Sequence, residues 1–318
     1  MIQHCPLITV IALCYNHEKF VVESLQSVVN QDYGNIELII VDDCSDDGSQ
    51  EQILKFSQEN PTVKVIFNPE NLGNCRSFNQ ALKIAKGKYV IDLATDDVLL
   101  PNRITEQVRC FEISEHIGVV FSDAEYIDEN SKVLGGFYLE NKLIPQGNIY
   151  KYLLKESFIM PSSMMIRKSI LDSLGGYDET LSYEDFDFWI RSSRICEYAF
   201  VPKVLVQQRI VKGSHSTKFY EKNNPLIRST FKVCQKALSL NETEEENQAL
   251  IFRLRIFLRK CFYTQNFAEG REVIGILKQL RGQNWLSKII SRFIIWKISI
   301  NFLYIRYINL RKFLRFKF

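Results

Sequence analysis

The chain has 318 residues, of which 46% are hydrophobic, so it is long enough to bury a sizeable core. Its 40 Lys and Arg nearly balance 37 Asp and Glu, which excludes a strongly basic or acidic protein. The eight cysteines show no C-x-x-C spacing, so neither a zinc site nor a disulfide framework is expected. The sequence has no uninterrupted apolar stretch of about 18 residues, so no membrane-spanning helix is expected. The N-terminus lacks the basic region of a signal peptide, so none is expected.

The N-terminal half alternates predicted strands and helices. Apolar, β-branched runs predict strands over 7–13, 36–41, 63–67 and 89–93, and helical patterns cover 20–29, the stretch from 50, 78–85 and the stretch from 101. This alternation predicts an α/β fold, with a mostly parallel sheet between helices.

Polar residues follow three of these strands where each strand ends. Cys14-Tyr15-Asn16-His17 follows the first strand, Asp42 and Asp43 the second, and Asp96 and Asp97 the strand at 89–93. Ligands bind beyond the carboxyl ends of parallel strands, so we expect the three clusters at one edge. Paired carboxylates suit Mg²⁺ or Mn²⁺, which commonly also hold a substrate diphosphate. The alternative is a turn with two solvated acids, one of which caps the next helix.

The middle of the chain supplies further strands and a second acidic motif. Strands are predicted over 119–124 and 157–167. The Gly175-Gly176-Tyr177-Asp178 turn is a sharp link that tolerates positive φ. A helix then opens at Asp185, which places this carboxylate in the first helical turn.

Several of these motifs occur together in one known family. They are Asn16 in the Cys-Tyr-Asn turn, Val-Asp-Asp-Cys-Ser-Asp-Asp-Gly-Ser at 41–49, Asn71-Leu72-Gly73, Gly87-Lys88-Tyr89, Asp96-Asp97, Gly175-Gly176-Tyr177-Asp178-Glu179 and the Glu184-Asp185 helix start. In this order and spacing the chain resembles family 2 glycosyltransferases over roughly residues 6–216. The resemblance implies an inverting, nucleotide-sugar-dependent enzyme with the GT-A fold. It departs in one place, because the family's Asp-x-Asp-Asp motif reads Ala94-Thr95-Asp96-Asp97 here. Asp92 lies inside the strand, and we expect its alternation to be wrong for replacing Ala94.

The resemblance implies a role for each candidate site residue. Asp96 and Asp97 would hold Mn²⁺ or Mg²⁺, and Asp185 would be the catalytic base rather than only a helix cap. The predicted nucleotide-binding residues are Tyr15, Asn16, Asp43, Arg76 and Asp96. The Asp43 carboxylate is able to accept the imide N–H of uracil, which favours a UDP-sugar. For Tyr15, the alternatives are packing on the nucleobase or ordinary packing within the protein. For Arg76, they are contact with a phosphate or exposure to solvent.

The histidines carry weaker signals. His215 lies near the place where this family often has a His after an Arg, although Val211 occupies the apparent matching position, so His215 is a doubtful substitute for a diphosphate or metal contact. His4, His17 and His116 show no ligand spacing and are interpreted as surface residues.

The C-terminal region is basic and aromatic. Residues 281–318 carry nine Lys and Arg and no acid, with Trp, Phe, Tyr, Ile and Leu between them. This composition is typical of an interfacial helix on an anionic membrane surface. The alternatives are core packing or a partner helix, and nucleic-acid binding, which we disfavour. With free thiols and this tail, we expect a cytoplasmic protein at the inner face of the cell membrane.

The predicted organisation is a GT-A catalytic domain over 1–216 and a helical appendage over 217–318. Residues 1–100 would form the nucleotide-sugar half and 101–216 the acceptor half. The predicted function is inverting transfer from a nucleotide-sugar, with UDP favoured, to a hydroxyl of a saccharide or lipid-linked saccharide in cell-surface polysaccharide synthesis. One alternative is a degenerate nucleotide-sugar-binding protein, suggested by Ala94. A nucleotidyltransferase is a further alternative. Such an enzyme needs a Gly-rich loop with a basic residue after the first strand, and this sequence lacks one there.

Overall fold

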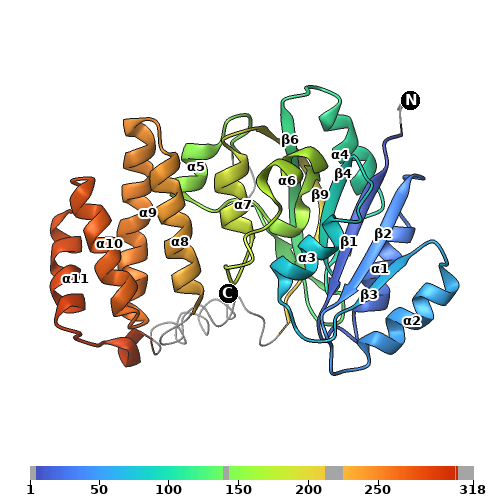
Figure 1. Ribbon diagram of the computed structural model, residues 1–318, viewed down its shortest axis with the longest axis horizontal. Helices are drawn as coiled ribbons and strands as arrows, with labels where there is room; N and C mark the ends of the chain where they lie inside the picture. Colours follow the sequence, from blue (N-terminus) through green and yellow to red (C-terminus); the bar gives the residue numbers. More distant parts are fainter. Residues whose placement is uncertain (1–4, 139–142, 212–224, 305, 307–318) are drawn as a thin grey trace. The chain divides into compact units, whose positions relative to one another are not determined.

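The structure, a computed structural model, describes residues 5–138, 143–211, 225–304 and 306 (Figure 1). The chain divides into two compact units. The first comprises Met1–Ile149 and Phe158–Val211, and the second comprises Tyr150–Ser157 and Lys212–Phe318.

The first unit is built on one mixed sheet. Its strands are β1 (Ile8–Cys14), β2 (Ile36–Asp42), β3 (Lys64–Phe67), β4 (Tyr89–Ala94), β5 (Val98–Leu99), β6 (Ile117–Ile127), β7 (Val133–Gly136), β8 (Met165–Arg167) and β9 (Glu197–Arg209). The order is β3-β2-β1-β4-β8-β6-β9-β5, with β7 paired to β6. The β3-β2-β1-β4 half is parallel, and β8 joins it to the other half through antiparallel pairs.

Helices and one 3₁₀ turn connect these strands. They are α1 (Val21–Val29), α2 (Ser49–Glu59), α3 (Asn74–Leu82), α4 (Arg103–Phe111), η1 (Pro161–Ser163), α6 (Lys168–Leu174) and α7 (Asp185–Ser192). Every residue of β1 is buried, as expected for a parallel strand with helices over both faces. The α/β fold class predicted from the alternation is therefore confirmed.

The second half of the sheet departs from the sequence prediction. The strand predicted over 157–167 is wrong over most of its length, because only Met165–Arg167 is extended and Pro161 opens a 3₁₀ turn. Proline has no N–H to donate to a ladder, so it interrupts a strand at this point. The 13-residue strand β9 carried no clear alternation and was not predicted.

The second unit is helical, as predicted for the C-terminal region. It contains α5 (Tyr150–Lys155), α8 (Pro225–Leu240), α9 (Glu244–Tyr263), α10 (Phe267–Gln279) and α11 (Trp285–Ile295). Helix α5 lies inside the range 101–216, and no sequence signal assigned it to this unit. It is held there by Arg253 of α9, whose guanidinium donates to the carbonyls of Leu153 and Leu154 at 2.7 and 2.6 Å.

Two capping boxes fix helix starts in this unit. Thr243 and Glu246 cap α9 reciprocally, and Asn284 and Ser287 cap α11 in the same way. Within the described ranges, no helix combines the length and the apolar character needed to cross a bilayer. The predicted basic tail lies partly in 307–318, outside the described residues.

Candidate active site

The three polar clusters meet at one edge of the sheet, as the sequence predicted. β1 pairs in parallel with both β2 and β4, so their carboxyl ends are neighbours. The Asp43 N–H donates to the Cys14 carbonyl at 2.8 Å, and the Thr95 N–H donates to the Leu13 carbonyl at 3.0 Å. The edge is therefore continuous from the loop after β2 to the turn after β4.

The turn after β1 is tied to the loop after β2 through Asn16. This residue has a φ of 59°, a left-handed conformation that Asn tolerates better than most residues. Its N–H donates to the Ser45 hydroxyl and its Oδ1 accepts the Asp46 N–H, both at 2.9 Å. The neighbouring Tyr15 side chain is 45% exposed, so it does not pack in the core and remains open to a ligand.

Asp43 holds the Asn71-Leu72-Gly73 turn in place. Its Oδ1 accepts from Asn68, Ser77 and the Leu72 N–H at 2.8–2.9 Å, and its Oδ2 accepts from the Gly73 N–H at 2.8 Å. The carboxylate is buried, and this set of donors satisfies it without a ligand. Any contact with a nucleobase would use the remaining capacity of Oδ2.

Asp96 and Asp97 occupy different environments, although they are adjacent. The Asp96 carboxylate is partly exposed, with one oxygen 3.9 Å from Nε2 of His17. Asp97 is buried, and its Oδ1 accepts the Arg209 N–H at 3.0 Å. Burial, followed by the nearby Asp96 charge, raises the pKa of Asp97 well above its usual range. Asp96 is therefore the acid that faces the edge, and Asp97 turns toward the interior.

His17 lies at the edge with its side chain 22% exposed, and it contacts the turn after β4, which its expected surface position did not predict. Its Nδ1 lies 2.9 Å from the Thr95 hydroxyl, and its Nε2 faces Asp96. A lone histidine in a loop gives no spacing signal, and only the parallel pairing of β1 with β4 brings it to Asp96. His215 lies outside the described residues.

The edge offers few metal ligands of its own. No group of three or more His, Cys, Asp or Glu side chains able to hold a metal occurs in the described part of the chain. Asp96 and His17 supply one oxygen-bearing and one nitrogen ligand, a set that Mn²⁺ accepts. The residues thus fit a metal that completes its coordination with ligand oxygens and water.

Arg209 at the end of β9 organises the turn that carries the two acids. Its guanidinium donates to the carbonyls of Asp96 and Asp128 at 2.9 and 2.8 Å and pairs with Glu23 at 2.7 Å. It also lies 4.7 Å from the centre of the Phe20 ring. The side chain is fully buried, so this arginine fixes backbone rather than contacting solvent. No sequence pattern indicated this role.

Asp185 opens α7, as predicted, and is partly exposed. Its Oδ1 accepts the Phe186 N–H at the start of the helix. Asp187 differs, because it is buried and pairs with Arg191 at 2.7 Å. Arg191 in turn donates to the carbonyls of Leu174 and Gly176, at 2.9 Å each. Asp187 is therefore structural, and Asp185 is the acid of this pair that is accessible to a ligand.

The Gly175-Gly176 turn ends α6 and begins the segment that leads to α7. Both glycines have positive φ, 71° and 77°, as the sequence predicted for a φ-permissive link. A Cβ on Gly176 would also lie 2.3 Å from Oδ1 of Asn79. Asn79 of α3 exchanges hydrogen bonds with the backbone of Tyr177 at 2.9 Å, which locks the segment before α7 to α3.

A second acidic pair lies beside this segment. Asp92 on β4 and Glu184 before α7 are both partly buried, and burial, then the Glu184 charge, raises the pKa of Asp92 well above its usual range. Burial also raises the pKa of Glu184, which the neighbouring Asn74 opposes. Asp92 and Ala94 are two residues apart on one strand, so they share a face. The expectation that Asp92 has the wrong alternation to replace Ala94 was therefore wrong.

Arg76 remains the least constrained of the predicted donor-binding residues. Its side chain is 57% exposed in the first turn of α3 and lies 3.6 Å from a Glu179 oxygen. An exposed ion pair of this kind contributes little to stability.

The fold and its edge define a class of protein, an α/β protein with a cluster of polar and acidic side chains at the carboxyl ends of its parallel strands. Residues 9–175 match the family described as "Glycosyl transferase family 2". The chain belongs to this family and has the GT-A fold, so it is a glycosyltransferase.

Curated relatives agree with this assignment. An uncharacterized glycosyltransferase of Methanocaldococcus jannaschii is 34% identical over 208 residues, which cover 64% of this chain and 71% of the relative. The UDP-Glc:alpha-D-GlcNAc-diphosphoundecaprenol beta-1,3-glucosyltransferase WfgD of Escherichia coli is 28% identical over 184 residues, which cover 58% and 68%.

Solved structures share the fold. The S. aureus TarS 1–349 complex with UDP-GlcNAc has a TM-score of 0.65 and 20% identity, covering 86% of this chain and 81% of that one. The mannosyltransferase PcManGT of Pyrobaculum calidifontis, in complex with GDP-Man and Mn²⁺, has a TM-score of 0.59 and 14% identity, covering 91% and 79%.

Replacing Arg209 by Lys tests its role beneath the acidic turn. Lysine keeps the charge but not the forked donors, so buried carbonyl groups lose partners and the free energy of unfolding should fall by about 1–3 kcal/mol. Denaturant unfolding measures this. Arg109→Lys, at an exposed pair with Glu106, is the control and should change stability by less than about 0.5 kcal/mol. Equal, small effects of both variants would contradict a role for Arg209 as the anchor of the turn.

The Asp92–Glu184 pair predicts how stability depends on pH. Because their pKa values are raised, the folded state keeps protons that the unfolded chain loses near about pH 4. The free energy of unfolding should fall as pH rises from there through the raised pKa values. Asp92→Asn removes one of the two charges and should raise the melting temperature at pH 8 but not at pH 4.

Thermal unfolding between pH 4 and pH 8 measures this difference. Glu115→Gln, at an exposed loop acid, is the control and should follow the wild-type curve. If the melting temperatures of the wild type and Asp92→Asn changed in parallel between pH 4 and pH 8, the charged pair would not destabilise the folded protein at neutral pH.

Proposed function

We propose that the protein is an inverting glycosyltransferase that moves a sugar from a nucleotide-sugar to a hydroxyl of a saccharide or lipid-linked saccharide. The observation that carries this proposal is the presence of two partly exposed acids on different elements of one unit. Asp96 faces the carboxyl edge of the parallel strands, and Asp185 opens α7 on the acceptor side. An inverting transfer needs one group at the leaving diphosphate and one base at the acceptor hydroxyl.

The donor would lie along the edge formed by β1, β2 and β4. Tyr15, with its exposed ring, and Asn16 would contact the nucleobase and ribose, and Oδ2 of Asp43 would accept the uracil imide N–H. Arg76 is exposed and is a candidate contact for a phosphate. TarS has been solved with UDP-GlcNAc, and WfgD is named for UDP-Glc, which supports a UDP-sugar.

A divalent cation, Mn²⁺ or Mg²⁺, would be held by Asp96 together with donor oxygens, with His17 as a further ligand. When bound, it supplies Lewis-acid stabilisation of the departing diphosphate. Asp97 is also a predicted ligand, but its burial and its bond to Arg209 favour a supporting role. The mannosyltransferase PcManGT has been solved with Mn²⁺, which supports a metal-assisted reaction.

Asp185 would take the proton of the acceptor hydroxyl as that oxygen attacks the anomeric carbon from the face opposite the nucleotide. Helix α7 favours a negative charge in its first turn. Glu184 precedes Asp185, but it lies beside Asp92, and burial raises its pKa, so it holds its proton to a higher pH than an ordinary carboxyl group. Asp187 is committed to Arg191.

The relatives and the C-terminal helices support a proposal for the acceptor and the location. WfgD is named for a diphosphoundecaprenol-linked acceptor, which supports a lipid-linked saccharide in cell-surface polysaccharide synthesis. Helix α11 exposes Trp285, Ile289 and Arg292, which supports peripheral association with the anionic inner face of the cell membrane and a cytoplasmic active site.

Ala94 favours one alternative, a nucleotide-sugar-binding protein without turnover. Where the family motif has its first acid, the Ala94 side chain supplies no oxygen. Asp92 lies on the same face of β4 but is partly buried and close to Glu184, so it does not simply take the place of that acid.

The metal proposal predicts that Asp96 and Asp97 differ in importance. Asp96→Asn should remove most donor turnover, and added Mn²⁺ should not restore it, because an amide is a poor ligand for the cation. Asp97→Asn keeps an acceptor for the Arg209 N–H and should retain more activity. EDTA should inactivate the wild type, and Mn²⁺ should restore it. Full wild-type turnover in EDTA would rule out the metal.

The base proposal predicts a loss in rate without a loss in donor affinity. Asp185→Asn preserves size and helix capping but accepts no proton, so the rate should fall by about 10²–10⁴. Asp187→Ala is the matched control: it breaks a buried ion pair and should cost about 3–5 kcal/mol of stability. Transfer rate, UDP affinity and thermal unfolding separate these effects. Normal turnover by Asp185→Asn would exclude Asp185 as the catalytic base and would make Glu184 the next candidate.

A further inference from the structure

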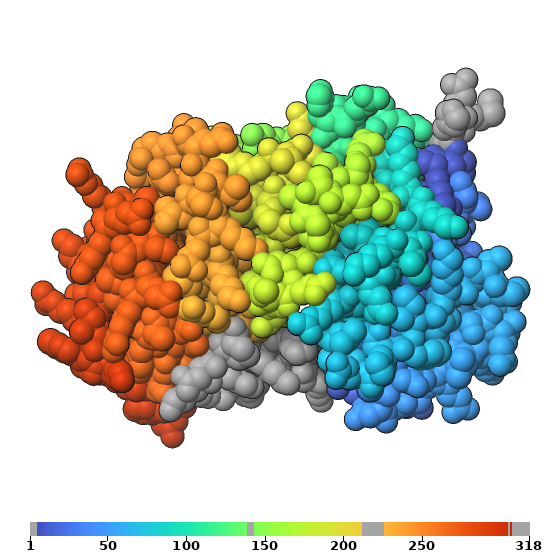
Figure 2. All heavy atoms as spheres, in the orientation of Figure 1, coloured from blue at the N-terminus to red at the C-terminus, as the bar shows by residue number. Residues whose placement is uncertain are grey.

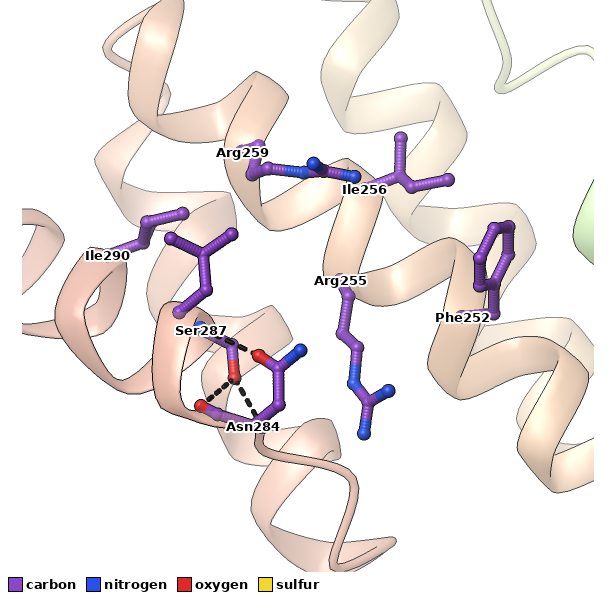
Figure 3. Close-up of a pocket in the computed structure, with 8 residues that line it drawn as sticks. Phe252, Arg255, Ile256, Arg259, Asn284, Ser287 and Ile290 are labelled. Atoms are coloured by element: carbon purple, nitrogen blue, oxygen red, sulfur yellow. Dashed lines mark hydrogen bonds between the residues drawn. The ribbon is translucent and has the colours of Figure 1, made fainter.

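The helical unit contains a groove between α9 and the start of α11 that the proposed sugar transfer does not use. Figure 3 shows Arg255 and Arg259 on α9 facing this region and Asn284 and Ser287 on the opposing helix start. The cavity has a volume of about 160 Å³. Its lining residues are Phe252, Arg255, Ile256, Arg259, Asn284, Leu286, Ser287 and Ile290. It is thus apolar on its walls and cationic on one side.

The two groove arginines are not neutralised by acids. Arg255 donates from Nε to the Gly282 carbonyl at 2.7 Å, which orients the side chain but leaves its charge uncompensated. For Arg259 no bond or ion pair is recorded in the part of the chain that the structure describes. Arg228 of α8, in contrast, pairs with Glu272 at 2.6 Å and lies 3.9 Å from Glu269.

The sequence around the groove keeps acids away from it. Helix α9 has no acid after Glu246, and α11 has none at all. Both arginines are partly buried against apolar neighbours, where a cation gains from an anionic ligand that is shielded from water. A guanidinium matches phosphate oxygens with two parallel donors. The groove therefore suits a phosphate.

The exposed face of α11 lies on a different side of the helix from the groove residues Leu286, Ser287 and Ile290, and it is both apolar and cationic. Trp285 is 73% exposed and Ile289 is 40% exposed, and Lys288 and Arg292 lie on the same side of the helix. Trp296, just after the helix, is 68% exposed. Side chains of the orange and red helices stand out from the surface in Figure 2. Apolar and cationic side chains on one helix face favour the interface of an anionic bilayer.

We propose that this groove binds the phosphate of an anionic phospholipid, with Arg259 as the main ligand and the α11 face set into the membrane surface. The proposal deepens the proposed membrane association by assigning a specific lipid-phosphate site. It does not depend on the sugar-transfer chemistry. Charge complementarity with the two arginines, together with the groove-lining ring of Phe252, which is 50% exposed, commits the groove to a lipid rather than to a free anion.

Vesicle binding of the full chain tests this proposal. Wild-type protein should bind phosphatidylglycerol vesicles and bind phosphatidylcholine vesicles much more weakly. Arg259→Gln should lower the affinity for phosphatidylglycerol by about fivefold or more. Arg271→Gln, an exposed position on α10 outside the groove, makes the same charge change and should lower the affinity less than about twofold.

Two further variants separate a site from general attraction. Arg259→Lys keeps the charge but loses the fork, so it should lose part of the affinity if a phosphate is held there. Trp285→Ser should remove binding that persists in high salt, because apolar burial is not screened. Thermal unfolding and donor hydrolysis should match wild type for all variants, so a failure here is distinguishable from a failure of the proposed catalysis.

Three results would overturn the proposal. One is an equal loss of vesicle affinity in Arg259→Gln and Arg271→Gln, which would mean that the protein binds by general charge attraction and not through a specific site. Another is no binding of the wild type to phosphatidylglycerol vesicles. The third is displacement of the protein from vesicles by low millimolar inorganic phosphate, which would assign the groove to a free anion.

Discussion

The buried guanidinium of Arg209 is the constraint on which the edge of the sheet depends. It comes from the end of β9 and reaches the carbonyl of Asp96, the carbonyl of Asp128 and the carboxylate of Glu23. Three separate segments of the chain are thus fixed by one side chain that makes no contact with solvent. The Arg209 N–H also holds Asp97 inward, which leaves Asp96 as the acid that faces the edge.

Acids of this unit serve two different purposes. Asp43 and Asp187 are satisfied by protein donors and stabilise the loops around the site, through the Asn71-Leu72-Gly73 turn and through Arg191. Asp96 and Asp185 are partly exposed, and these are the groups available to a ligand. A buried carboxylate that lost its donors would pay a large desolvation cost, which is why the supporting acids carry so many hydrogen bonds.

The local parts of the fold were predictable from the sequence. Apolar runs gave β1, β2 and β4, and the acids at their ends gave the edge, because parallel pairing makes these positions neighbours. The Gly175-Gly176 turn and the helix start at Asp185 also carried local signals. Family membership came from the same motifs.

Long-range partners were not predictable. Arg209 meets Glu23 across 186 positions, and no spacing rule links them. His17 joins Asp96 because β1 lies beside β4, and α5 joins the helical unit through bonds of Arg253 to its C-terminal carbonyls and of the Tyr150 hydroxyl to α8 and the residue after it. The strand predicted over 157–167 failed because hydrophobicity does not report the missing N–H of Pro161. Sequence patterns identify elements, whereas single polar contacts decide how the elements meet.

The central claim is that Asp96 at this edge binds a nucleotide diphosphate through a divalent cation. Calorimetric titration of UDP into the wild type and into Asp96→Asn, each with and without Mn²⁺, tests it most directly. The account predicts that Mn²⁺ strengthens UDP binding to the wild type and has no effect on the variant. The same UDP affinity in all four titrations would contradict it.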